Sequence, residues 1–142
     1  MPTRKASAVW EKGLKDGKGS FKGESGSVSG SYSFGSRFEN AKGSNPEELL
    51  AAAEAACFSM ALALGLEQNG TPAETVETNA ACTVEKVAEG FKITTMSLIV
   101  NAKVAGIDDA TFQKIASATK DGCPVSQALK GNVAITLTAK LN

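Results

Sequence analysis

The sequence predicts a single α+β domain spanning residues 1–142. About six strand-like segments flank one long apolar segment, and two shorter helical patterns follow near the end. These elements are grouped along the chain instead of strictly alternating, which is typical of α+β proteins. The chain length suits one domain with one core, and a hydrophobic content of 42% is ordinary for a globular protein.

The first segment, residues 4–43, is rich in glycine. It contains eight of the 14 glycines among short alternating stretches, which predicts three short strands joined by turns. A flexible linker is the alternative, but a linker needs fewer large apolar side chains. Those of this segment are Val9, Trp10, Phe21, Val28, Tyr32, Phe34 and Phe38. We therefore expect a small sheet here.

A long helix is predicted over residues 45–69. The stretch Ser44-Asn45-Pro46-Glu47-Glu48 offers a cap at Ser44 or Asn45, a proline suited to the first turn, and two carboxylates for the positive helix end. Gly70 suits the left-handed position that ends a helix. At roughly 1.5 Å per residue, the helix would be about 37 Å long.

This helix is apolar nearly all round in its middle, residues 49–64, which indicates burial on every side. One chain of this size has too little other structure to cover all faces, and the many alanines let helices approach closely. The sequence therefore predicts a homodimer packed across this helix. The uncharged run 55–66 is shorter than the roughly 20 residues of a membrane span, so no membrane association is expected.

The second half predicts a hairpin, two helices and a last strand. Residues 75–87 and 91–103 alternate around a short turn, and residues 108–122 open on two aspartates and end at a glycine. A short helix is expected over 123–129, and a strand over 133–141 with its odd positions inward. The first of these helices has an apolar face formed by Phe112, Ile115 and Ala116.

Composition excludes several kinds of function. Fifteen basic residues balance 15 acidic ones, so no electrostatic feature favours nucleic acid or an anionic membrane. The absence of histidine excludes Ser-His-Asp and Cys-His catalysis and histidine zinc sites. No secretory signal is recognisable at the start, and an odd cysteine count fits a reducing compartment, which predicts the cytoplasm. Thiols, carboxylates, Arg, Lys, hydroxyls or the backbone must do the chemistry.

The three cysteines have different contexts. Cys57 lies in the middle of the apolar helix, where a small buried hydrophobic residue is the usual interpretation, and Cys82 alternates with apolar residues on a strand and is expected to be structural. Cys123 precedes Pro124 at a helix amino end, which favours a thiolate and makes it the most activated thiol by this argument. Three cysteines without histidine make a structural metal site unexpected.

Several motifs together resemble a known family. They are Gly35-Ser36-Arg37-Phe38-Glu39, Asn45-Pro46-Glu47-Glu48-Leu49-Leu50, Ala55-Ala56-Cys57-Phe58-Ser59-Met60-Ala61-Leu62, Val104-Ala105-Gly106-Ile107-Asp108 and Cys123-Pro124-Val125-Ser126. On these motifs the chain resembles the OsmC/Ohr family of organic hydroperoxide reductases, over about residues 5–141. It looks closest to the osmotically inducible branch of that family.

The resemblance implies an intertwined homodimer of antiparallel sheets and long central helices, acting as a thiol peroxidase without metal, haem or flavin. Carried onto this sequence, Cys57 is the peroxidatic thiol, Cys123 the resolving thiol, and Arg37 and Glu47 match the other site positions. The alternative for Arg37 is a surface pair with Glu39. The alternative for Glu47 is a role at the helix start alone.

The proposed reaction is attack of the Cys57 thiolate on a peroxide, capture of the sulfenic acid by Cys123, and reduction by an external dithiol such as dihydrolipoamide. A mid-helix thiol receives little help from its own helix field, so a cation is expected beside it, and Arg37 is the candidate. Glu47 lies about 15 Å before Cys57 along the helix, which favours a site built from both subunits.

Glu54 departs from the family pattern, because relatives commonly carry histidine there. Its carboxylate lies three residues before Cys57 and would raise the thiol pKa unless Arg37 neutralises it. This departure leaves open an alternative of the same fold, a non-catalytic thiol redox sensor or a protein that binds a small apolar ligand. An apolar pocket for alkyl or lipid-like hydroperoxides is expected near the site. Its candidate residues are Phe34, Phe38, Phe58 and Met60.

Overall fold

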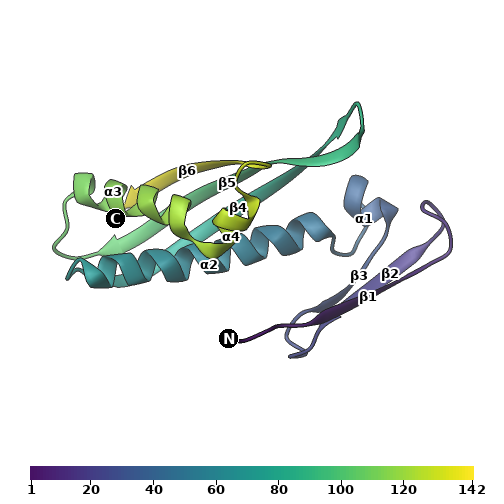
Figure 1. Cartoon of the computed structure of the whole chain (residues 1–142), viewed down its shortest axis with the longest axis horizontal. Coiled ribbons are helices and arrows are strands. Elements are labelled where there is room, and N and C mark those ends of the chain that lie inside the picture. The colour runs from purple at the N-terminus through teal and green to yellow at the C-terminus, as the bar shows by residue number, and fades with distance from the viewer. The chain divides into compact units, whose positions relative to one another are not determined.

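The computed structural model describes all residues, 1–142 (Figure 1). Its residues cluster into two compact units, Met1–Leu49 and Leu50–Asn142. Each unit contains one three-stranded sheet. The α+β class and the six strands predicted from the sequence are confirmed, and a fourth helix is added.

The first unit contains the antiparallel sheet that the glycine-rich segment predicted. Strands β1 (Ala6–Glu11), β2 (Lys18–Gly23) and β3 (Ser29–Tyr32) pair in the order β1-β2-β3, so the linker alternative is wrong. Helix α1 (Phe34–Phe38) follows and was not predicted. Its amino end is fixed by reciprocal hydrogen bonds between Ser33 and Ser36. Five residues are too few for a helical pattern to be read from sequence.

Helix α2 (Pro46–Gln68) ends within a residue of the predicted bounds. Of the two possible caps, Asn45 is used, because its Oδ1 accepts the backbone N–H of Glu48 at 2.8 Å. The Ser44 hydroxyl instead donates to the Glu48 carboxylate. At the other end Gly70 has a φ of 80° and its N–H donates to the carbonyl of Glu67, as the glycine signal predicted.

The second sheet is mixed, not wholly antiparallel. Strands β4 (Ala73–Val87) and β5 (Gly90–Val104) form the predicted hairpin, while β6 (Ala134–Leu141) pairs with β5 in parallel. The expectation of antiparallel sheets is therefore wrong for β6. The chain reaches β6 from β5 through two helices, and a crossover of that kind returns the next strand in the same direction.

Those two helices match their predicted segments. Helix α3 (Asp109–Gly122) is capped by Asp108, and α4 (Pro124–Leu129) has Cys123 as its N-cap residue. Hydrogen bonds to Thr111 hold the pKa of the Asp108 carboxyl below its ordinary value, which is the sign of a working cap. In β6 the odd positions are half-buried and the even ones exposed, as the alternation predicted.

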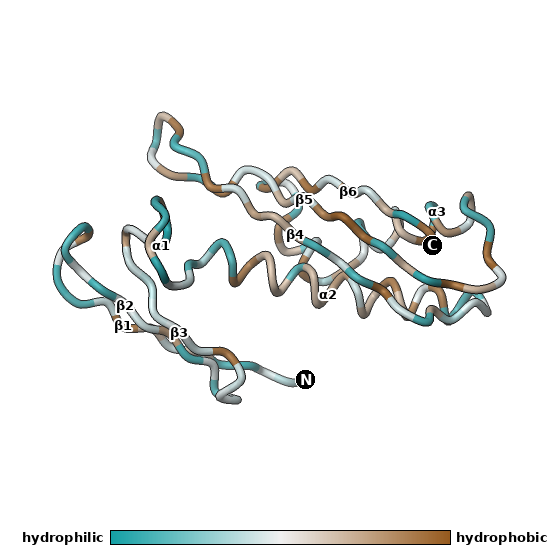
Figure 2. Tube along the Cα trace, turned by 180° about the vertical axis from the view of Figure 1, so that it is seen from behind, coloured by the Kyte–Doolittle hydropathy of each residue, from teal (hydrophilic) through white to brown (hydrophobic).

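The core of the second unit is built by α2, the sheet and α3. Phe58 and Leu62 of α2 and Phe112 of α3 are completely buried with the central residues of β5. Figure 2 shows the hydrophobic stretch of β5, and Figure 1 shows α2 running along the same sheet. The residues of α2 that enter the interior recur every fourth position. They are Glu54, Phe58, Leu62 and Leu66.

The opposite side of α2 is apolar and exposed. Met60 is 78% exposed and Leu64 53%, and the residues between them in the helix are mostly alanine. By length and composition alone α2 could cross a membrane, since its apolar window has a mean hydropathy of 1.9. The uncharged run 55–66 is shorter than this apolar window and does not reveal it. A core helix of a water-soluble protein passes the same test, so the finding is weak evidence for a membrane.

Candidate active site

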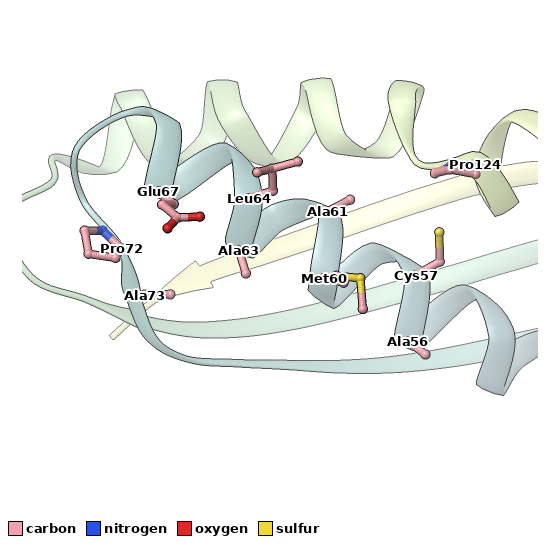
Figure 3. A pocket seen from close by; sticks show the side chains of 10 residues that line it. All are labelled: Ala56, Cys57, Met60, Ala61, Ala63, Leu64, Glu67, Pro72, Ala73 and Pro124. Carbon is pink, nitrogen blue, oxygen red and sulfur yellow. The ribbon is translucent and has the colours of Figure 1, made fainter. Parts of the chain in front are cut away.

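Two sulfur atoms from distant parts of the second unit meet at the start of α4. The Cys123 thiol donates to Cys57 Sγ, with 2.9 Å between the sulfurs, and both cysteines are free thiols. Cys123 is 1% exposed, whereas Cys57 is half-buried and reaches a cavity. Figure 3 shows the Cys57 side chain on α2 directed towards Pro124, the first residue of α4. A disulfide bond of about 2.05 Å would need only a small approach of the two sulfurs.

The amino end of α4 contacts Cys57 and begins at Cys123. Cys123 makes no side-chain capping hydrogen bond, whereas the backbone N–H of Val125 donates to Cys57. The sequence predicts that the favourable helix end acts on Cys123 and that Cys57 receives little help from its own helix. The structure adds one contact that the sequence did not predict, because the N–H of Val125 in α4 reaches Cys57.

Burial is the largest influence on the Cys57 thiol and raises its pKa above the ordinary value. The hydrogen bond with Cys123 and the charges of Cys123 and Glu54 raise the pKa further, and the Val125 N–H opposes them. Within this unit Cys57 is therefore held as a thiol to higher pH than a free cysteine. An added cation would be needed to favour the thiolate.

An apolar cavity of about 830 Å³ opens beside Cys57 (Figure 3). Its volume lies within the usual range for small-molecule sites. Met60 lines it, as expected, but Phe58 does not, because that side chain is completely buried in the core. Phe34 and Phe38 belong to the first unit, where their ring centroids lie 5.1 Å apart and the rings are tilted by 51°. The cavity lining also includes Ala61, Leu64, Ala73 and Pro124.

Arg37 and Glu47 form an ion pair within the first unit. Arg37 Nη2 donates to Glu47 Oε1 at 2.8 Å, and Arg37 Nε donates to both carboxylate oxygens at 3.1 and 3.3 Å. Glu47 is buried and the Arg37 side chain is 35% exposed. The alternative pairing of Arg37 with Glu39 is not present. Glu47 also lies in the first turn of α2, so the same carboxylate binds the guanidinium and complements the positive end of the helix.

Glu54 is a buried carboxyl group in the second unit, with no exposed surface. Its Oε1 accepts a hydrogen bond from the hydroxyl of Ser126 in α4, and its Oε2 has no partner. The sequence did not identify Ser126. The available signal was its position three residues after Cys123, in the first turn of the short helix.

Cys82 takes part in the core instead of the thiol pair. It lies on β4 opposite Met96 of β5 and packs against the buried cluster, as the sequence predicted. No cluster of three or more His, Cys, Asp or Glu side chains is arranged to hold a metal ion.

Two free thiols in contact at the wall of an apolar cavity, one of them on a long core helix packed on a mixed sheet, define a small α+β protein with a two-cysteine site. The model of the OsmC-like protein family matches residues 39–138. The chain belongs to the OsmC-like family.

Relatives and solved structures agree with this family. The chain is 45% identical to Peroxiredoxin OsmC of Escherichia coli (strain K12) over 138 residues, 96% of each chain. It is 37% identical to the organic hydroperoxide resistance protein OhrB of Bacillus subtilis (strain 168) over 103 residues, 72% of this chain and 74% of that protein. The crystal structure of Bacillus subtilis OhrB superimposes with a TM-score of 0.75 at 27% identity, covering 96% of this chain and 98% of OhrB. An OsmC-like protein from Mycoplasma pneumoniae gives 0.77 at 15% identity over 99% and 97% of the two chains, which supports the fold alone.

Proposed function

We propose that this protein is a cysteine-based peroxidase that reduces organic hydroperoxides to alcohols and hydrogen peroxide to water. The contact that carries the proposal is the 2.9 Å approach of the Cys123 and Cys57 sulfurs at the wall of an apolar cavity. The names of the relatives, a peroxiredoxin and organic hydroperoxide resistance proteins, support a peroxidase role.

The reaction has two covalent steps. The Cys57 thiolate attacks one peroxide oxygen, the O–O bond breaks, and the alkoxide leaves with a proton as the alcohol, so that Cys57 becomes a sulfenic acid. The Cys123 sulfur then attacks Cys57 Sγ, and the displaced hydroxide takes the thiol proton and leaves as water. An external dithiol, such as dihydrolipoamide, reduces the resulting disulfide and restores both thiols.

Arg37 is proposed as the cation that Cys57 lacks within its own unit, and Glu47 as the group that orients it. A guanidinium is permanently charged and presents several donors, so it can stabilise the thiolate and a peroxide oxygen at once. The bidentate contact with the buried Glu47 limits the positions that the guanidinium can take.

A homodimer is proposed as the working form. Residues 1–49 bury little of their own surface, with Gly19, Ser36 and Glu47 as their buried residues, which is too little for a stable core. The exposed apolar side of α2 is a second surface that a partner subunit would cover. We expect this thiol enzyme to work in the reducing environment of the cytoplasm.

The test is peroxide consumption by the purified, reduced protein with cumene hydroperoxide and dihydrolipoamide. We expect turnover with wild type and Cys82→Ser, and none above background with Cys57→Ser. With the dithiol left out, Cys123→Ser should consume about one peroxide per chain and then stop, with a sulfenic acid trapped at position 57, because the resolving thiol is lost.

Two outcomes would contradict these assignments. Wild type that consumes no more peroxide than Cys57→Ser would refute the enzyme and favour a redox sensor or a binder of small apolar ligands. A sulfenic acid trapped at Cys123 in preference to Cys57 would reverse the two roles while leaving the activity intact.

A further inference from the structure

We propose that Glu54 is a positioning residue for the thiol pair: through Ser126 it holds the amino end of α4, and with it Cys123, against Cys57. The inference rests on the proposed function for its meaning in catalysis, but its tests need no peroxide.

The geometry links the two cysteine-bearing helices at a second point. Glu54 lies three residues before Cys57 on α2, and Ser126 lies three residues after Cys123 at the start of α4. Residues at that spacing lie on one side of a helix, so the carboxyl–hydroxyl contact runs beside the sulfur–sulfur contact. Helix α4 has only six residues, which is too short to be stable without tertiary contacts.

Burying a carboxyl group costs free energy, which packing alone does not explain. Glu54 has no exposed surface, takes part in no ion pair, and leaves Oε2 without a hydrogen-bond partner. Burying an unpaired polar oxygen costs free energy, and an apolar residue of similar size would avoid that cost. The hydrogen bond that Glu54 does make is to the helix that carries Cys123.

The groups around the pair are few. Cys123 and Glu54 are the ionisable groups that act on Cys57. Every charged side chain of the β4-β5-β6 sheet lies at an exposed position. Cys82 is the titratable residue on the face of that sheet that packs against the core. Near Ser126, a small polar cavity of about 170 Å³ is bordered by Lys120, Asp121 and Lys130. Glu54 is thus the carboxyl group that acts on Cys57, and its charge opposes formation of the thiolate.

Two variants test the two roles of Glu54 separately, the hydrogen bond to Ser126 and the negative charge near Cys57. Glu54→Gln keeps an oxygen to accept the Ser126 hydroxyl but removes the charge, and Ser126→Ala removes the hydrogen bond but keeps the carboxyl. Matched controls make the same chemical changes at exposed positions, Glu77→Gln on β4 and Ser117→Ala on α3.

The first measurement is the equilibrium between the Cys57–Cys123 disulfide and dithiothreitol. Ser126→Ala should weaken the disulfide about fivefold, the equivalent of one net hydrogen bond, while Glu54→Gln and both controls stay close to wild type. If Ser126→Ala does not fold, Glu54→Leu, which also removes the hydrogen bond, is measured with the same expectation. An unchanged equilibrium in the folded variant would overturn the positioning role.

The second measurement is the pH dependence of Cys57 alkylation by iodoacetamide, followed by mass spectrometry. Removing a nearby negative charge favours the thiolate, so Glu54→Gln should move the midpoint to lower pH and raise the rate at pH 7 about twofold. A role in packing alone would not move this midpoint. A Glu54→Gln profile that superimposes on those of wild type and Glu77→Gln would overturn the electrostatic part of the inference.

Discussion

At the residue scale, the Cys57 thiol depends on its burial and on groups from two helices. Burial raises its pKa most, Cys123 and Glu54 raise it further, and the N–H of Val125 opposes them. A thiol held in this state reacts slowly near neutral pH, because the thiolate is the nucleophile. The proposed peroxidase therefore requires a compensating cation.

The first prediction at this scale concerns that cation. Replacing Arg37 by alanine should raise the Cys57 pKa and lower kcat/KM for cumene hydroperoxide about tenfold or more, since one pKa unit is a tenfold change in ionisation. Arg37→Lys should recover part of the loss, because a lysine keeps the charge but not the paired donors. The measurement is the pH profile of kcat/KM.

Arg4→Ala provides the matched control, since Arg4 is an exposed arginine in the same unit. Should Arg37→Ala keep both the kcat/KM and the pH profile of Arg4→Ala, the cation at Cys57 must come from elsewhere. The pair with Glu47 would then be a structural contact at the start of α2.

At the element scale, α2 has to approach α3 closely for the core to close. A Cβ atom added at Gly65 of α2 would lie 2.9 Å from Ile115 Cγ2 of α3, which is too close without a shift. That methyl group is attached directly to Cβ of a branched side chain, so it has little freedom to move. The glycine is explained by this approach, despite its cost to helix propensity.

Gly65→Val should therefore lower the free energy of unfolding by about 1–3 kcal/mol, the usual cost of overpacking a core. Urea unfolding at a fixed protein concentration measures it. Gly122→Val is the control, because nothing lies within 4 Å of a Cβ there. Adding Ile115→Ala to Gly65→Val should recover part of the lost free energy of unfolding. If the effects of the two substitutions on that free energy simply add, the two residues do not compete for space.

At the scale of the whole molecule, the first unit and helix α2 each leave large apolar side chains exposed. The first unit has almost no core of its own, and α2 exposes Met60 and Leu64 on the side that faces away from its sheet. Both features agree with the homodimer that the sequence predicts. A membrane is the competing partner for α2, and the two are separable by experiment.

Sedimentation without detergent should show a dimer of the 14.6 kDa chain. Ala53→Glu places a charge on the exposed side of α2 and should weaken self-association about a hundredfold or more, because burying an unpaired charge costs several kcal/mol. Ala118→Glu, at an exposed position of α3, should stay dimeric. A monomeric wild type, or one that needs detergent to remain in solution, would contradict the homodimer.

Local sequence signals were sufficient to predict most of the helices and strands. The apolar alternation and the signals at Asn45, Gly70 and Asp108 predicted the long helix, the hairpin, α3 and the last strand almost to the residue. They did not predict α1, which is too short to show a period, or the parallel pairing of β6, which depends on the path of a crossover. Strand direction is a property of the assembled sheet and has no local signal.

The sequence by itself determined the α+β class, the absence of histidine chemistry and, through the family motifs, the candidate residues Cys57, Cys123, Arg37 and Glu47. Only the tertiary structure brought the two sulfurs to 2.9 Å, directed the α4 amino end to Cys57, and placed Glu54 against Ser126. The physical reason is that composition and periodicity act over a few residues. The pKa of a thiol is set by whatever folding places around it, here groups up to 68 positions away (Val125) in the chain.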